Sequence, residues 1–147
     1  MITSDSYSNR LRIRSCGLLV KDEKLLLVEL RSPVTNQWTW IPPGGGVKFG
    51  ESIEEALIRE FEEETGLEIS VGTRVHINQV IQPPIHAIEF YFLVKEEGGS
   101  LNLGTDPELE SDQQILRNIG FYSRREIAEM NTAPEFIKSQ FWSEFIS

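Results

Sequence analysis

The sequence predicts one α+β domain over residues 1–147, made mostly of strands, with one helix in the middle and one at the end. Three observations support this fold class. A chain of 147 residues is long enough to bury a single core. Several short segments alternate apolar and polar residues, as half-buried strands do. Two other segments repeat their apolar residues at the period of an amphipathic helix, and no internal repeat is visible.

Two strands joined by a short turn are expected first. Residues 11–20 form the first predicted strand, in which arginines alternate with apolar residues. These arginines are Arg10, Arg12 and Arg14. We expect them to face solvent, with contact to a substrate by one of them as the alternative. A polar turn at 21–24 leads into a second strand at 25–30, so the two strands should pair as a hairpin.

A loop at 31–37 and a short strand at 38–41 should then deliver the chain to a group of glycines. Trp38 and Trp40 are two residues apart and therefore face the same side of this strand. We expect a pair of core residues, and a stacking platform for a nucleobase is the alternative. Arg31, at the end of the preceding strand, is a candidate contact for a substrate phosphate.

The group of glycines can bring the backbone close to a ligand. Gly44, Gly45 and Gly46 permit close approaches that side chains forbid, while Pro42 and Pro43 stiffen the entry. A loop of this kind can turn amides or carbonyls toward a phosphate or a metal ion. An ordinary turn would explain the glycines equally well.

A helix should follow and end at Gly66. Ser52 and Glu55 have the spacing of a capping box, and Gly66 can take the left-handed conformation that closes a helix. An apolar stripe on this helix should face the core. The stripe consists of Ile53, Leu57 and Phe61, extended by Ile58 and Thr65.

Three glutamates form a second stripe on the same helix. Glu60, Glu63 and Glu64 are spaced at i, i+3 and i+4, so their carboxylates lie close together. Like charges at this spacing repel, and the end of a helix favours basic residues instead. A bound cation would offset this repulsion, and carboxylate oxygens suit Mg²⁺ or Mn²⁺. A solvated acidic face is the alternative.

Strands are expected again after the helix. Two of them, at 68–75 and 76–82, should precede the breaker at 83–84. The clearest strand covers 87–95, which is rich in aromatic and β-branched residues. Glu89 alternates with Tyr91 there, so we expect this face of the strand to be wetter than the opposite one.

A long loop, a last strand and a helix should complete the chain. Residues 98–114 form a loop rich in Gly, Asp and Glu, and such long loops are usually functional or disordered. The final strand should lie within 115–123, and a helix should begin near Pro134. Its apolar face, expected to dock on the sheet, contains Phe136, Ile137, Phe141 and Phe145.

The negative charge is concentrated in two places. The net charge is −9; residues 44–67 contribute −5 and residues 95–112 another −5, so the remainder sums to +1. This acidity would repel a polyanion in the absence of metal ions. No extended basic stripe is visible, so long nucleic acid is not an expected partner.

The single cysteine, Cys16, cannot form an internal disulfide and lies in an apolar run, so we expect a buried structural thiol in a reducing compartment. No stretch of 18 apolar residues occurs, and the polar N-terminal segment does not resemble a signal peptide. A cytoplasmic protein without a membrane partner is therefore expected.

The segment from Gly45 to Leu67 resembles the Nudix box. The pattern of this family is G, five residues, E, seven residues, then R-E-U-x-E-E-x-G-U, where U is a bulky apolar residue. Nine positions across 23 residues match without a gap: Gly45, Glu51, Arg59, Glu60, Phe61, Glu63, Glu64, Gly66 and Leu67. At Phe61 the family more often has an aliphatic residue. The resemblance implies an α/β/α sandwich around a mixed sheet.

The resemblance also implies roles for individual residues. The metal ligands would be Glu60, Glu63 and Glu64, which together would bind about one to three Mg²⁺ ions. Mn²⁺ could substitute for Mg²⁺. Gly45 would add a backbone carbonyl ligand, and Glu51 an accessory carboxylate. Arg59 would hold a carboxylate of the box in place. The general base varies among relatives, and Glu60 and Glu63 are the first candidates here. The loop ahead of the last strand often supplies a further carboxylate in this family, and Glu108, Glu110 and Asp112 are the candidates for it. Glu110 is kept both as a possible base and as a possible metal ligand.

The reaction implied by the resemblance is hydrolysis of a diphosphate bond in a nucleoside diphosphate linked to another moiety. ADP-ribose or a nucleotide sugar is the first expectation, and a nucleoside triphosphate the second. Relatives that isomerise diphosphates and inactive relatives that sense a nucleotide are further alternatives. Many relatives form homodimers, but the sequence shows no interface signature, so a homodimer stays open.

Overall fold

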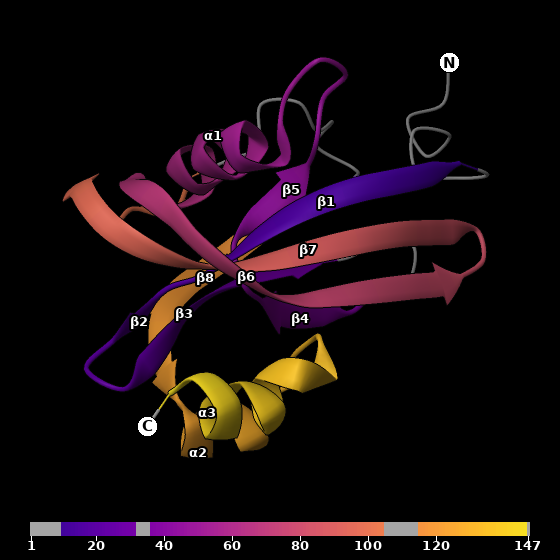
Figure 1. Ribbon diagram of the computed structural model, residues 1–147. Coiled ribbons are helices and arrows are strands. Elements are labelled where there is room, and N and C mark those ends of the chain that lie inside the picture. Colours follow the sequence, from indigo (N-terminus) through magenta and orange to yellow (C-terminus); the bar gives the residue numbers. More distant parts are fainter. Residues whose placement is uncertain (1–9, 32–35, 105–114, 147) are drawn as a thin grey trace.

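The computed structural model describes residues 10–31, 36–104 and 115–146, which fold into three layers. Helix α1 covers one side of two β-sheets, and the helices near the C-terminus cover the other side (Figure 1). The elements are β1 (Leu11–Leu18), β2 (Val20–Lys21), β3 (Lys24–Arg31), β4 (Trp38–Ile41), β5 (Gly44–Gly46), α1 (Ile53–Thr65), β6 (Leu67–Gln82), β7 (Ile85–Gly99), β8 (Ile115–Ser123), α2 (Arg124–Ala128), the 3-10 helix η2 (Glu135–Lys138) and α3 (Gln140–Phe145). The expected α/β/α sandwich is confirmed.

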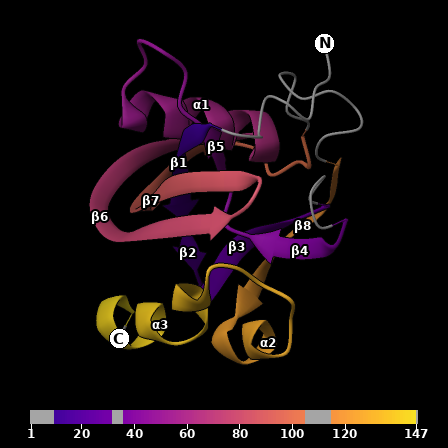
Figure 2. The same ribbon diagram turned by 90° about the vertical axis from the view of Figure 1, so that its right-hand side faces the viewer.

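The two sheets differ in strand direction. The first has the order β5-β1-β7-β6, in which β1 and β7 run parallel and the other pairs run antiparallel, so this sheet is mixed. The second is antiparallel: β2 and β4 pair with the two ends of β3, and β8 pairs along β3 as well. Figure 2 shows both sheets between α1 and the C-terminal helices.

The prediction that the first strand pairs with the strand at 25–30 is wrong for most of its length. Instead of one strand over 11–20, β1 ends at Leu18, and only the short β2 pairs with β3. β1 pairs with β5 and β7 in the other sheet. Leu18 and Leu19 are both buried, but in different hydrophobic clusters: that of Leu18 includes residues of the C-terminal helices, and that of Leu19 includes residues of α1. Alternation predicted a strand, but it could not predict the partner.

Two charged side chains expected in water are largely withdrawn from it and pair with each other. Arg14 donates from Nη1 to Oε2 of Glu89, and Glu89 also accepts bonds at 3.0 Å from Asn78 and from the hydroxyl of Tyr91. The face that carries Glu89 and Tyr91 is therefore not wetter than the other, which corrects the expectation. Burial raises the pKa of Glu89, but Arg14 and these donors outweigh it and hold that pKa below its ordinary value.

The strands after α1 are longer than expected. β6 runs continuously from Leu67 to Gln82, with irregular register near Val71 and Arg74, where two separate strands were predicted. The prolines at 83–84 separate it from β7, as expected, and β7 extends beyond the predicted 87–95. The two strands therefore form one long antiparallel hairpin.

The C-terminal segment is divided into shorter helices than predicted. Residues Arg124–Ala128 form α2, which was missed although Ser123 and Glu126 make a complete capping box. The final helix is a 3-10 turn followed by α3. Three residues of the predicted apolar face are buried, namely Phe136, Ile137 and Phe141, whereas Phe145 is exposed. They pack with residues of both sheets, including the buried Cys16.

No helix in the described ranges is long and apolar enough to span a membrane.

Candidate metal and phosphate site

Helix α1 begins and ends where its capping residues predict. The hydroxyl of Ser52 accepts from the amide of Glu55, the carboxylate of Glu55 accepts from the amide of Ser52, and Gly66 is left-handed with φ 77°. Phe61 is fully buried, as expected for the core stripe. Ile58 is exposed, which corrects its place in that stripe. The caps therefore fix where the helix begins and ends.

The glycines of β5 bring the backbone against the acidic side of α1. The amide of Gly44 donates to Oε1 of Glu64 at 3.1 Å. A Cβ added to Gly45 would lie 2.4 Å from Oε2 of Glu60, a distance that real Cβ contacts do not show. Alanine at this position would therefore force the Glu60 carboxylate to move.

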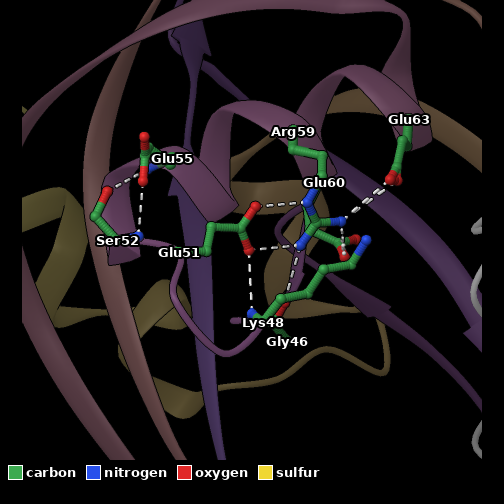
Figure 3. A network of polar contacts seen from close by, with 8 residues as sticks. All are labelled: Gly46, Lys48, Glu51, Ser52, Glu55, Arg59, Glu60 and Glu63. Carbon is green, nitrogen blue, oxygen red and sulfur yellow. Dashed lines mark hydrogen bonds and ion pairs between the residues drawn. The ribbon is translucent and has the colours of Figure 1, made fainter.

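One guanidinium joins three carboxylates of this region, as Figure 3 shows. Arg59 forms a fork with Glu51 at 2.8 and 3.0 Å. Its Nη1 donates to Glu60 at 2.9 Å and to Glu63 at 3.1 Å, and its Nη2 donates to the carbonyl of Gly46 at 3.2 Å. The expectation that Arg59 pairs with a box carboxylate agrees with these contacts.

The contacts of Arg59 also change the ionisation of Glu51. Hydrogen bonds from Arg59 lower the pKa of Glu51 to about 2, and the amide of Lys48 contributes to the same shift. The side chain of Glu60 is only 2% exposed, whereas that of Glu63 is 20% exposed. Water can therefore reach Glu63 more readily than Glu60.

The donor set fits a hard divalent cation by its chemistry. Glu60, Glu63 and Glu64 offer carboxylate oxygens beside the close backbone approach at Gly45, and Mg²⁺ prefers oxygen ligands. Within the described parts of the chain, no three acidic, histidine or cysteine side chains converge as they do in a formed metal centre. The guanidinium of Arg59 lies between two of these carboxylates and holds their present spacing.

Other predicted site residues lie apart from this cluster or outside the described residues. Arg31 ends β3 and is paired with Trp38 of β4, in the sheet that does not contain the glycine strand β5. The three loop candidates, Glu108, Glu110 and Asp112, fall in the range 105–114, which the structure does not describe.

The structure adds a second polar cluster that the sequence analysis missed. Glu29 is buried in β3 and accepts two bonds from Arg117, at 3.0 and 2.8 Å, and one from Asn118. The guanidinium of Arg117 stacks on Trp38 at 3.8 Å, while Trp40 packs edge-on against Tyr122. Trp38 and Trp40 therefore do not form a core pair with each other. The sequence signal that could have indicated this cluster is Glu29, a single glutamate within the apolar run of β3.

The fold and the site together define a class of domain, a mixed-sheet α/β/α sandwich that sets a glycine strand against a capped, glutamate-rich helix. The chain belongs to the NUDIX domain family, whose model matches residues 11–135. The resemblance drawn from the box is therefore confirmed.

Known relatives share much of the chain. An ADP-ribose pyrophosphatase of Methanocaldococcus jannaschii is 37% identical over 105 residues, which are 70% of this chain and 61% of that protein. This chain thus matches less than two thirds of that relative's length. An RNA pyrophosphohydrolase of Campylobacter jejuni is 30% identical over 118 residues, covering 71% of this chain and 70% of that protein. The solution structure of the E. coli ORF135 protein superposes with a TM-score of 0.68 and 25% identity, over 87% of this chain and 84% of that one.

Proposed function

We propose that this protein is a Mg²⁺-dependent pyrophosphohydrolase that cleaves a diphosphate bond in a nucleoside diphosphate linked to another moiety. The observation that carries the proposal is the cluster of Glu51, Glu60 and Glu63 around Arg59, set against the glycines of β5. A relative named ADP-ribose pyrophosphatase supports ADP-ribose or a nucleotide sugar as the favoured substrate class.

The metal site of this proposal consists of Glu60, Glu63 and Glu64, with a carbonyl of Gly45. Bound divalent ions would supply neutralisation of the diphosphate and activation of the attacking water. Glu64 is held in place by the amide of Gly44, and Arg59 holds Glu60 and Glu63. These contacts orient the carboxylates before a ligand arrives, which lowers the cost of binding it.

Among the candidate general bases, exposure favours Glu63. A general base must lie within hydrogen-bond reach of the water whose proton it accepts. Glu60 is almost fully buried, whereas Glu63 is partly open to solvent. Glu110 remains a candidate from the loop.

The second candidate is a nucleoside triphosphate pyrophosphohydrolase. Both substrate classes contain the phosphoanhydride that the glutamates and the glycine strand would bind, so the described site supports either. The concentration of negative charge favours a small substrate over a long nucleic acid. The buried thiol of Cys16 supports a reducing compartment such as the cytoplasm.

The test is phosphate or nucleotide release from a panel that contains ADP-ribose, UDP-glucose, ATP, dGTP and a short 5′-triphosphate RNA, each with Mg²⁺ or Mn²⁺. We expect the largest turnover with ADP-ribose or UDP-glucose. The highest rate with ATP or dGTP would select the second candidate. Binding of a nucleotide without turnover would instead indicate a sensor.

Two substitutions test the site itself. Glu63→Gln and Glu64→Gln should fold normally and lose at least about a hundredfold in turnover, the scale expected for a catalytic carboxylate or metal ligand. Glu62→Gln is the matched control, because Glu62 is exposed on the same helix. Full Mg²⁺-dependent activity in both site variants would refute the assignment.

A further inference from the structure

Beneath the acidic side of α1 lies a buried hydroxyl whose role is unexplained. Ser15 in β1 is fully buried, and within the described residues its Oγ has no hydrogen-bond partner. A buried hydroxyl left without a partner destabilises the folded state, because burial removes its hydrogen bonds to water. Such a group therefore calls for a specific explanation, commonly an ordered water.

The register of the sheet places Ser15 under Glu60. Ser15 is directly opposite Gly45 in the antiparallel pair of β1 and β5. Side chains of opposite residues project from the same face, with their Cβ atoms about 4.5–5.5 Å apart. The Cβ direction of Gly45 leads to the carboxylate of Glu60, at 2.4 Å. The side chain of Ser15 therefore projects from the face of the sheet that meets this carboxylate.

A second position on β1 fixes the same orientation. Gly17 lies two residues after Ser15, so both point to the same face of the strand. A Cβ added to Gly17 would lie 2.8 Å from the ring of Phe61, the residue that follows Glu60 in α1. Ser15 thus shares its face of the sheet with two glycines, where α1 packs closely against the sheet.

We propose that Ser15 is a positioning residue for Glu60, and that its hydroxyl binds a buried water which also bonds to the Glu60 carboxylate. A hydroxyl provides one donor and two acceptor sites, so it can bond a water whose own hydrogen reaches the carboxylate. A bridge of this kind is enthalpically close to a direct hydrogen bond. It would hold Glu60 from below while Arg59 holds it from the side.

The first test is the stability of the metal-free protein. If the water bridge exists, Ser15→Ala removes a satisfied group and should raise the unfolding equilibrium constant about three- to tenfold. If the hydroxyl is unpartnered, its removal should stabilise the fold instead, which would overturn the proposal. A double-mutant cycle with Glu60→Gln should show coupling of at least about threefold. Additive effects would also overturn it.

The second test measures Mn²⁺ binding by calorimetry and rests on the proposed function. Ser15→Ala should raise the dissociation constant about two- to tenfold, because Glu60 is less well held. Thr132→Val is the matched control: Thr132 Oγ1 is likewise buried without a partner in the described chain, but it lies beside Trp40, so Mn²⁺ binding should not change. An unchanged dissociation constant in Ser15→Ala would refute the positioning role. Absence of Mn²⁺ binding by the unsubstituted protein would count against the proposed function alone, and the stability cycle would still decide on Ser15.

Discussion

Replacing Arg59 with alanine should destabilise the protein and change its response to acid. The substitution removes donors from Glu51, Glu60 and Glu63 at once. Removing the charged partner of a buried carboxylate lowers the free energy of unfolding by about 3–5 kcal/mol, whereas an exposed ion pair contributes less than about 1 kcal/mol to it. Glu60 is nearly buried and the other two are partly exposed. We therefore expect a loss of about 3 kcal/mol at pH 7, the lower end of the range for a buried pair.

The loss should depend on pH with a definite sign. The pKa of Glu51 is lowered from 4.5 to about 2 in the folded protein, chiefly by Arg59. A depressed folded pKa stabilises the protein above the unfolded pKa, and that contribution disappears as the pH falls from about 4.5 toward 2. Without Arg59, the pKa of Glu51 should return toward 4.5. The difference in stability between the two proteins should therefore narrow below about pH 4.5.

Urea unfolding followed by tryptophan fluorescence at pH 7, 4 and 3 would measure this difference. Arg74→Ala, at an exposed arginine of β6, is the control and should shift the midpoint little at any of these values. Arg59→Lys keeps the charge but cannot form the fork with Glu51, so an intermediate loss is expected. A stability difference for Arg59→Ala that stays constant from pH 7 to pH 3 would refute the reasoning.

Three further predictions concern the packing around the site. Gly45→Ala should lower the free energy of unfolding in urea by about 1–3 kcal/mol, because its Cβ would overlap the carboxylate of Glu60. Gly46→Ala is the control and should lower it less, since its Cβ would meet only the end of the Arg12 side chain, at 3.3 Å. Equal losses in the two variants would contradict this reasoning. Arg14→Met leaves the Glu89 carboxylate buried without its cation and should cost about 3–5 kcal/mol, a loss that a second change, Glu89→Gln, should reduce. Burial raises the pKa of Cys16 to about 12, so a thiol reagent at pH 8 should react with it only on unfolding, and rapid reaction with the folded protein would show that the thiol is accessible.

The local elements were determined by short-range patterns in the sequence. The ends of α1 follow from Ser52, Glu55 and Gly66, because capping depends on residues within one turn of the helix. The stripe of Glu60, Glu63 and Glu64 follows from helical periodicity alone. The family could be identified for the same reason, since all nine positions of the box lie within 23 consecutive residues. The final strand, β8, was likewise visible from its local composition.

Only the tertiary structure decided how distant segments meet. Arg14 and Glu89 are 75 residues apart, and Glu29 and Arg117 are 88 apart, so no periodicity could show that these charges form pairs. The partner of β1 was equally invisible, because alternation defines the faces of a strand but not its neighbours.

In the candidate site, too, some features follow from local sequence and others from tertiary packing. The sequence by itself determined that three carboxylates lie on one side of α1, because their spacing is local. The tertiary structure decided that Gly45 lies against Glu60 and that Ser15 lies opposite Gly45, because these contacts depend on how β5 and β1 pair under the helix. It also decided the accessibility of each carboxylate, since burial is a property of the assembled layers. The helix pattern thus specifies the donor atoms, and the packing of the sheet against the helix specifies where they are held.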